Sequence, residues 1–186
     1  MKQTDNPWTI IDGEELYNNN WITLTHYNVI NPGGGKGIYG KVHFKNLAIG
    51  IVPLDDNMNT YLVGQYRFTI GAYTWEIPEG GGPLDEDPLD AAKRELEEET
   101  GLRAEEWTEI QQMHLSNSVT DELSYVYLAQ GLSQHAPIPE ETEQLAVKKL
   151  PFEEALKMVE QNVITDSVTI AALLKVKLMM LDGRIK

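Results

Sequence analysis

Three glutamates of the segment RELEEE are the residues of this sequence best suited to metal chemistry. On a helix, Glu95, Glu98 and Glu99 stand three and four residues apart, so their carboxylates project together from one face. Such like charges repel each other, and although Arg94 can pair with Glu98 one turn later, one cation cannot neutralise three carboxylates. A divalent cation can, because carboxylate oxygens are hard ligands suited to Mg2+ or Mn2+. Taken alone, the segment is also typical of a solvated acidic helix face.

The residues around these glutamates predict a glycine-rich loop followed by a short helix. Glycines 80–82 form the loop and would let the backbone approach a metal ion or a phosphate without a Cβ clash. Asp87 can accept hydrogen bonds from the free amides of the first helical turn, and Pro88 suits the first helical position, where no N–H is needed. Gly101 is a natural C-terminal stop. The helix is therefore expected between Asp87 and Gly101, with an apolar face that includes Leu96.

The whole stretch from Gly80 to Leu102 resembles the Nudix box, G-x5-E-x7-R-E-U-x-E-E-x-G-U, in which U is an aliphatic residue. Every specified position matches, and with ordinary residue frequencies such a match arises by chance on the order of once in 10^8 starting points. By this resemblance the chain is identified as a Nudix hydrolase. The resemblance implies a metal-dependent enzyme with an α/β/α sandwich fold. Glu86 and Arg94 are expected to pair and to fix the loop against the helix.

The resemblance also implies which residues bind the metal. Glu95 and Glu99, one helical turn apart, are the expected ligands, and the backbone carbonyl of Glu79 is the ligand that the family places just before the glycines. Glu98 is expected to be shared with a second ion and is also a candidate catalytic carboxylate. Mg2+ is the expected ion, with Mn2+ as an alternative. Such ions screen phosphate charge, polarise the P–O bonds and lower the pKa of a bound water.

Three motifs outside the box resemble the ADP-ribose and nucleoside-diphosphate-sugar pyrophosphatase branch of the family. They are QYR at 65–67, WEIPEG at 75–80 and SVTDE at 118–122. This resemblance implies hydrolysis of the pyrophosphate bond of nucleoside diphosphate sugars of the ADP-ribose, GDP-mannose or ADP-glucose type, which yields a nucleoside monophosphate and a sugar phosphate. Where ADP-ribose enzymes often carry a proline before the Asp-Glu pair, this chain has Asn117, which leaves room for the other sugars.

Two other functions remain open. The same box could act on another nucleoside diphosphate derivative, such as a nucleoside triphosphate or a dinucleotide polyphosphate, although the WEIPEG and Asp-Glu motifs speak against this. The chain could also be a nucleotide-binding Nudix module that has lost catalysis. Degenerate copies of this kind usually lose glutamates of the box, and here all of them are present.

Three residues are expected to contact the substrate. Arg67 is predicted to clamp the diphosphate, because a guanidinium can bind phosphate bidentately. Trp75 would stack on the base or cover the ribose, and Glu76 would accept hydrogen bonds from sugar hydroxyls. The alternative for Trp75 is a place in the core, where aromatic residues of strands are usually found.

A general base should be a carboxylate within reach of the nucleophilic water. In this branch it comes from a loop after the central strands, and here that loop contains Glu140, Glu141 and Glu143. Glu141 and Glu143 agree best with the distance from the following strand, and Glu140 is close behind. An acidic loop of this kind is equally typical of a plain surface turn.

Composition limits the partners and the surroundings of the protein. The chain has 186 residues, with 15 Lys and Arg against 29 Asp and Glu, and a net charge of −14. This charge argues against nucleic acid as a partner, and the expected partner is a small nucleotide sugar. There is no cysteine, hence no disulfide, thiol nucleophile or zinc-thiolate site. The most apolar late segment is interrupted by Lys175 and Lys177, so no membrane span is expected, and a cytoplasmic protein is predicted.

The hydrophobic pattern predicts an α/β fold with a mixed β-sheet and an N-terminal β subdomain, which agrees with the α/β/α sandwich that the resemblance implies. Strands are expected near 38–45, 47–54, 60–67, 74–78, 105–116, 122–130 and 144–151, after extended segments within 8–30. The helices are the one in the box and two near the C-terminus. Residues 1–45 are expected to form an N-terminal extension, and residues 46–186 the hydrolase domain with its box at 80–102. Within the resemblance, such an extension often builds a homodimer, which is expected here.

Overall fold

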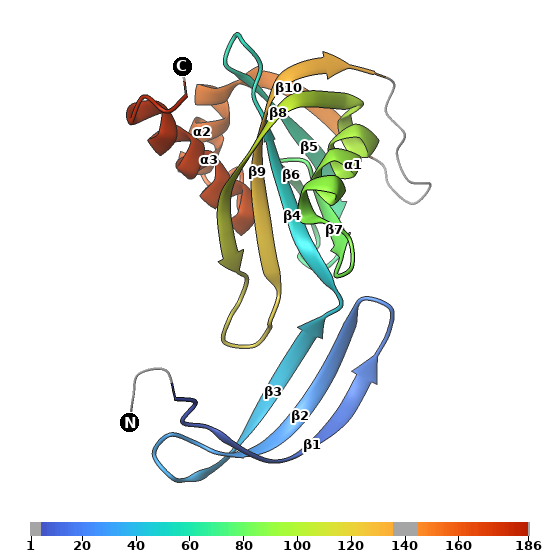
Figure 1. The fold of residues 1–186 in the computed structure, drawn as a ribbon, viewed down its shortest axis with the longest axis vertical. Helices are drawn as coiled ribbons and strands as arrows, with labels where there is room; N and C mark the ends of the chain where they lie inside the picture. Colours follow the sequence, from blue (N-terminus) through green and yellow to red (C-terminus); the bar gives the residue numbers. More distant parts are fainter. Residues whose placement is uncertain (1–4, 136–144, 186) are drawn as a thin grey trace. The chain divides into compact units, whose positions relative to one another are not determined.

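The computed structural model describes residues 5–135 and 145–185. They form two compact units. One unit combines the residues up to Asn46 with the segment His114–Glu122, and the other contains the remaining residues. Figure 1 shows the elements of both units.

A three-stranded antiparallel sheet forms most of the N-terminal unit (Figure 1). Its strands are β1 (Thr9–Asn18), β2 (Ile22–Ile30) and β3 (Lys36–Phe44), in the order β1-β2-β3. Asn19 closes the first turn, because its side-chain oxygen accepts hydrogen bonds from the amides of Trp21 and Ile22, both at 2.8 Å. Side-chain caps of this kind are why asparagine favours tight turns.

The segment His114–Glu122 is bound to β3 mainly through Asp121. This carboxylate accepts hydrogen bonds from the Phe44 amide at 3.0 Å and from His43 Nδ1 at 2.8 Å, and it pairs with Lys41 at 2.7 Å. Burial acts to raise the pKa of Asp121, but these bonds outweigh it and lower the pKa to about 2. Asp121 is therefore an ionised anchor for this segment.

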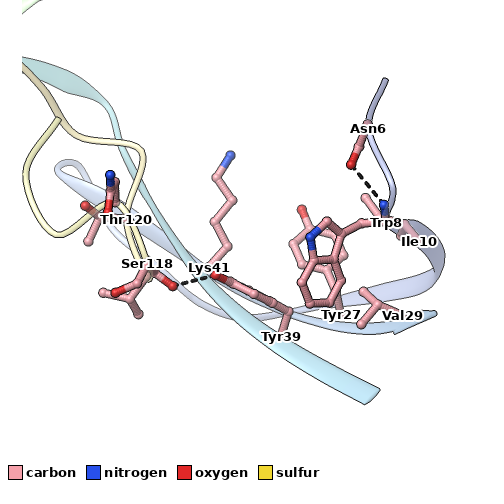
Figure 2. Close-up of a pocket in the computed structure, with 11 residues that line it drawn as sticks. Asn6, Trp8, Ile10, Tyr27, Val29, Tyr39, Lys41, Ser118 and Thr120 are labelled. Carbon is pink, nitrogen blue, oxygen red and sulfur yellow. Dashed lines mark hydrogen bonds between the residues drawn. The ribbon is translucent and has the colours of Figure 1, made fainter. Parts of the chain in front are cut away.

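A groove of about 410 Å³ opens on the N-terminal unit (Figure 2). Trp8 packs edge-on against Tyr39, with ring centroids 5.5 Å apart. The Tyr39 hydroxyl donates to the Ser118 carbonyl at 2.6 Å. Lys41 also lines the groove, although its ammonium pairs with Asp121. The groove is thus lined by three aromatic side chains together with aliphatic and polar residues.

The second unit contains two sheets and three helices among its described residues. The four-stranded sheet has the order β7 (Glu79–Pro83), β4 (Asn46–Pro53), β9 (Leu123–Gln134) and β8 (Leu102–His114), and the three-stranded sheet has the order β10 (Ala146–Pro151), β5 (Asn59–Arg67) and β6 (Ala72–Glu76). Strands β4 and β9 pair in parallel, whereas β5 is antiparallel to both of its neighbours. The helices are α1 (Pro88–Thr100), α2 (Phe152–Glu160) and α3 (Ser167–Leu181).

Helix α1 begins and ends where its capping residues predict. Asp87 accepts a hydrogen bond from the Leu89 amide at 2.8 Å, and Pro88 takes the first helical position. Gly101 has a φ of 69°, in the left-handed region that glycine favours, and its N–H donates to the Glu97 carbonyl at 2.9 Å.

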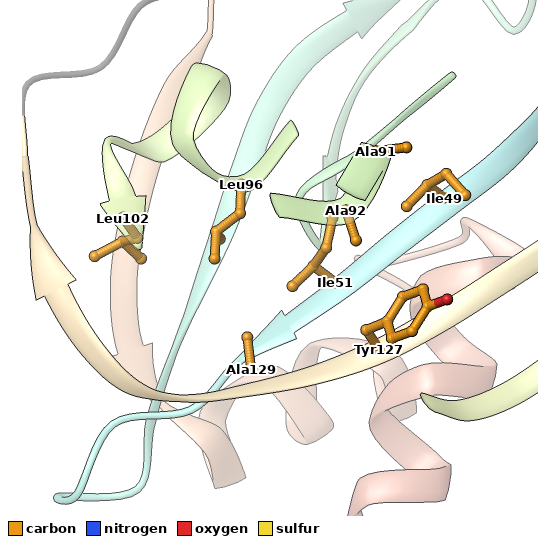
Figure 3. Packing of buried hydrophobic residues seen from close by; sticks show 8 residues of the cluster. All are labelled: Ile49, Ile51, Ala91, Ala92, Leu96, Leu102, Tyr127 and Ala129. Carbon is orange, nitrogen blue, oxygen red and sulfur yellow. The ribbon is translucent and has the colours of Figure 1, made fainter. Parts of the chain in front are cut away.

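Strand β4 separates the helices into two layers, since alternate residues of a strand point to opposite faces. Ile49 and Ile51 pack on α1, where a cluster of buried residues forms the core (Figure 3): Ile49, Ile51, Ala91, Ala92, Leu96, Leu102, Tyr127 and Ala129. On the other face, a Cβ at Gly50 would lie 2.9 Å from Val168 of α3. Figure 1 likewise shows α1 on one side of the strands and α2 and α3 on the other. The predicted α/β/α sandwich is confirmed.

One local prediction was wrong. Glycines 80–82 do not form a loop, because they belong to strand β7, which runs from Glu79 to Pro83. Glycine has a low strand propensity, but here the residues pair beside β4, and tertiary pairing overrides local preference. Within the described residues, no helix is both long and apolar enough to cross a membrane.

Candidate active site

Arg94 connects the acidic face of α1 to the strand before it. Its Nη1 donates to Glu95 at 2.7 Å and to Glu98 at 2.9 Å. Its Nη2 donates to the Gly81 carbonyl at 3.0 Å and reaches Glu86 at 3.4 Å. Burial alone would lower the pKa of Arg94, but the bonds to these carboxylates raise it. The guanidinium therefore offsets the repulsion between neighbouring glutamates, and the expected pair of Glu86 and Arg94 is present.

Glu95 lies directly against the backbone of Gly80. A Cβ at position 80 would stand 2.2 Å from the Glu95 carboxylate carbon, far inside any real contact distance. The φ of Gly80 is not positive, so glycine is required here for space rather than for backbone conformation. The Glu95 side chain is mostly buried, with 12% of its surface exposed. The first glycine of the box thus makes room for the first glutamate of the helix.

Glu99 is held at the same place by a backbone amide. Its Oε2 accepts a hydrogen bond from the Glu79 N–H at 2.9 Å, and the residue is buried. Glu99 and Glu95 are therefore both seated on the beginning of β7, at residues 79 and 80. The structure brings together the two expected metal ligands and the residue whose carbonyl was expected to complete the set.

These residues fit a divalent cation that takes only part of its ligands from the protein. Among the described residues, no group of three or more His, Cys, Asp or Glu residues is arranged to hold a metal ion with side chains alone. Mg2+ usually binds proteins through one or two carboxylates, with water and substrate phosphates as its other ligands. Glu95, Glu99 and the Glu79 carbonyl match such a set in ligand type, and the space that Gly80 leaves for Glu95 supports it.

A second group of charges lies at the other side of Glu79. Arg67, the last residue of β5, donates from Nε to the Glu76 carboxylate at 2.9 Å and from Nη2 to Glu79 Oε1 at 2.6 Å. Glu76 is 3% exposed and also accepts a hydrogen bond from the Thr74 hydroxyl at 2.7 Å. The structure thus brings Arg67 and Glu76 together, and the two residues form an ion pair with each other.

Glu79 carries an unusual carboxyl group. Its Oε2 is buried and has no hydrogen-bond partner within the described part of the chain. Burial raises the pKa of Glu79 well above its usual value, and the charges of Asp166 and Glu76 add to this effect. Arg67 counteracts it only in part. From the sequence, Asp166 is recognisable only as a cap of α3, and its effect on the distant Glu79 depends on the tertiary structure.

Trp75 is half-buried at the edge of this region. Tyr73 packs edge-on against its ring, with centroids 5.8 Å apart, and the Lys148 ammonium lies 4.0 Å from the ring centroid. Lys148 is a further neighbour that sequence reasoning missed, because β10 and β6 are far apart in the chain. The three candidates for the general base, Glu140, Glu141 and Glu143, lie outside the described residues.

An α/β/α sandwich in which a glutamate-rich helix is seated on a glycine strand is the arrangement expected of a Nudix hydrolase. A model of the NUDIX domain family matches residues 44–172, more than half of the chain, and the chain therefore belongs to this family.

The chain is also similar to individual members of the family and to a solved structure. The chain is 36% identical over 172 residues to an ADP-ribose pyrophosphatase of Mycobacterium tuberculosis, covering 89% of this chain and 81% of the relative. It is 33% identical over 162 residues to an ADP-ribose pyrophosphatase of Bacillus subtilis, covering 86% and 87%. The crystal structure of an ADP compounds hydrolase matches with a TM-score of 0.84 and 22% identity, over 96% of this chain and 97% of the other, and shows the fold.

Proposed function

We propose that the protein hydrolyses the pyrophosphate bond of nucleoside diphosphate sugars of the ADP-ribose, GDP-mannose or ADP-glucose type, and that it uses Mg2+, with Mn2+ as a substitute. The observation that carries the proposal is the seating of two glutamates of α1 on the start of β7: Glu95 on Gly80 and Glu99 on the Glu79 amide. The ADP-ribose pyrophosphatases at 33% and 36% identity support the substrate class.

In this proposal the chain holds the cation with Glu95, Glu99 and the carbonyl of Glu79. When bound, the cation neutralises charge on the diphosphate and lowers the pKa of a water molecule. Arg94 keeps Glu95 and Glu98 close together despite their like charges. Glu98 pairs with Arg94 and keeps 29% of its side-chain surface exposed, against 12% for Glu95, so it is the glutamate best placed to serve a second ion or to act as a catalytic carboxylate.

The proposed general base is Glu141, with Glu143 and Glu140 as alternatives. Each would take the proton from the attacking water, which needs a carboxylate within hydrogen-bond reach of it. Support for this assignment comes from the sequence alone, through the position of the three residues before β10.

Trp75, Arg67 and Glu76 are the proposed substrate contacts. The Lys148 ammonium lies over the Trp75 ring, so a base that stacks on this face would have to displace the lysine. Arg67 and Glu76 already bind each other, so direct contacts with the diphosphate or a sugar hydroxyl must use groups that this ion pair leaves free.

The test is turnover of a substrate panel by wild type and by two matched variants of α1. Phosphate release with phosphatase coupling is measured from ADP-ribose, GDP-mannose, ADP-glucose, diadenosine polyphosphates and nucleoside triphosphates, with Mg2+ and with EDTA. Glu99→Gln should lower kcat at least about 100-fold, since even indirect partners of a metal cost 10- to 100-fold. It should stay folded, because a glutamine oxygen still accepts from the Glu79 amide. Glu97→Gln is the matched control on the same helix. It removes a charge that pairs with Arg103 of β8 and should keep full activity.

Three outcomes would overturn parts of this proposal. Full activity of Glu99→Gln would refute the metal assignment. Activity confined to triphosphates or dinucleotides would retain the Nudix chemistry and refute the substrate class. Absence of any metal-dependent turnover would indicate a binding module without catalysis.

We also propose that the protein is a homodimer that acts in the cytoplasm. Every residue of β1 is exposed, and its apolar side chains include Ile10 at 62% and Leu16 at 56%. A second copy of the chain would cover such apolar surface. The absence of cysteine agrees with a reducing compartment. Light scattering tests the oligomeric state, and a clean monomer would contradict the dimer.

A further inference from the structure

Arg67 binds both ends of the short link between two strands. Glu76 is the last residue of β6 and Glu79 is the first residue of β7, so only Ile77 and Pro78 lie between them. The guanidinium donates from Nε to Glu76 at 2.9 Å and from Nη2 to Glu79 at 2.6 Å. A planar guanidinium bound to two carboxylates restricts the orientation of both.

The backbone of this link is positioned by other elements. The Ile77 amide donates to the Thr169 hydroxyl of α3 at 3.0 Å, and the Ile51 amide of β4 donates to the Pro78 carbonyl at 2.9 Å. The Glu79 amide then donates to Glu99 Oε2 at 2.9 Å. The link therefore ends directly at a proposed metal ligand.

The side chain of Glu79 depends on Arg67 more than its backbone does. Its Oε1 is bound by Arg67, whereas its buried Oε2 has no hydrogen-bond partner among the described residues. Without Arg67, the Glu79 side chain would lose the bond at 2.6 Å that restricts its orientation.

We propose that Arg67 is a positioning residue for the metal site: by holding Glu76 and Glu79, it fixes the backbone amide that binds Glu99 and the backbone carbonyl that is proposed as a metal ligand. This inference rests on the proposed function. This role adds to the proposed contact with the diphosphate, since it acts on the metal site before any substrate binds.

The test measures Mn2+ binding to the free protein by electron paramagnetic resonance, without substrate. Arg67→Gln should raise the Kd for Mn2+ at least about 10-fold, the lower range for loss of a residue that orients metal ligands. The KM for ADP-ribose is measured at saturating Mn2+, because loss of a substrate contact raises it whereas loss of metal positioning alone does not. Arg67→Lys, which keeps the charge but not the two-carboxylate geometry, should give an intermediate Kd, and it decides the question if the glutamine variant does not fold. Arg103→Gln is the control, because it removes only an exposed ion pair with Glu97 outside the site. It should bind Mn2+ as wild type does.

A second variant separates positioning from a general loss of stability. Glu79→Gln removes the carboxyl group that Arg67 binds but keeps the backbone groups. If Arg67 acts through Glu79, adding Arg67→Gln to Glu79→Gln should weaken Mn2+ binding less than Arg67→Gln does in the wild-type background. A Tm that falls while Mn2+ affinity stays unchanged would show a purely structural role and refute the proposal.

The remaining outcomes distinguish failure of this inference from failure of the proposed function. If Arg67→Gln binds Mn2+ like wild type but raises KM more than about 10-fold, Arg67 is a substrate clamp and the positioning role is wrong. If wild type binds no Mn2+, or if Glu99→Gln binds it as tightly as wild type does, the proposed metal site is wrong and both proposals are refuted.

Discussion

Replacing Gly80 by alanine would test the proposed metal site with a single methyl group. The new Cβ would lie 2.2 Å from the Glu95 carboxylate carbon and from Oε2, whereas ordinary contacts begin near 3.4 Å. The carboxylate must therefore move by about 1 Å or more. The backbone can accept alanine, because the φ of Gly80 is not in the left-handed region. The substitution thus displaces a proposed ligand without straining the chain.

The expected loss follows from the size of this movement. A misplacement of about 1 Å at a reacting centre can lower the rate about 100-fold, which corresponds to about 2.7 kcal/mol in the activation barrier. The Kd for Mn2+ should rise at least about 10-fold, as it does when ligand orientation is lost. Stability should change by less than about 1 kcal/mol, because Glu95 can turn towards solvent while the core below α1 stays packed.

Two other glycines provide controls for this substitution. A Cβ at Gly82 would meet Ile49 at 3.0 Å and Ala91 at 3.2 Å, so Gly82→Ala strains the core and should lower Tm while Mn2+ affinity is retained. A Cβ at Gly40 has nothing within 4 Å, so Gly40→Ala should change neither quantity. The reasoning is refuted if Gly80→Ala keeps wild-type kcat and Mn2+ affinity, or if Gly80→Ala and Gly82→Ala lose stability and metal binding alike.

Two further predictions concern stability. Burial acts to raise the pKa of Asp55, but bonds from Lys149 and Asn59 outweigh it and lower the pKa from 3.8 to about 2. Because the folded-state pKa is depressed, Asp55 contributes stability above about pH 4 that is lost as the pH falls towards 2, and urea titrations should show about 1 to 2 kcal/mol of acid-dependent loss that Asp55→Asn lacks. Equal slopes with pH in both proteins would contradict this. Leu96 is fully buried between α1 and β4, so Leu96→Ala should lower the free energy of unfolding by about 2 to 5 kcal/mol, and a loss below about 1 kcal/mol would show that the core collapses around the cavity.

Helix α1 and its spacing were predictable from the sequence, because they depend on neighbours in the chain. Asp87 caps an amide two residues later, and Gly101 ends the helix through its own backbone conformation. Glu95 and Glu99 lie one turn apart on any helix, so their common direction needs no tertiary information. The pair of Arg94 and Glu98 follows from the same periodicity.

The partners of Arg67 were decided only by the tertiary structure. Its ion pairs with Glu76 and Glu79 arise although Arg67 pairs with Ala72, the first residue of β6, because its long side chain extends along the β5–β6 hairpin to the end of β6. The register of that hairpin depends on packing across the whole unit. The same holds for the glycines of the box, which read as a loop by propensity and became strand β7 through pairing with β4. Local interactions thus determined where the glutamates stand on their helix. Contacts between distant segments determined what faces them, because a residue type alone does not specify which strand or helix will supply its neighbour.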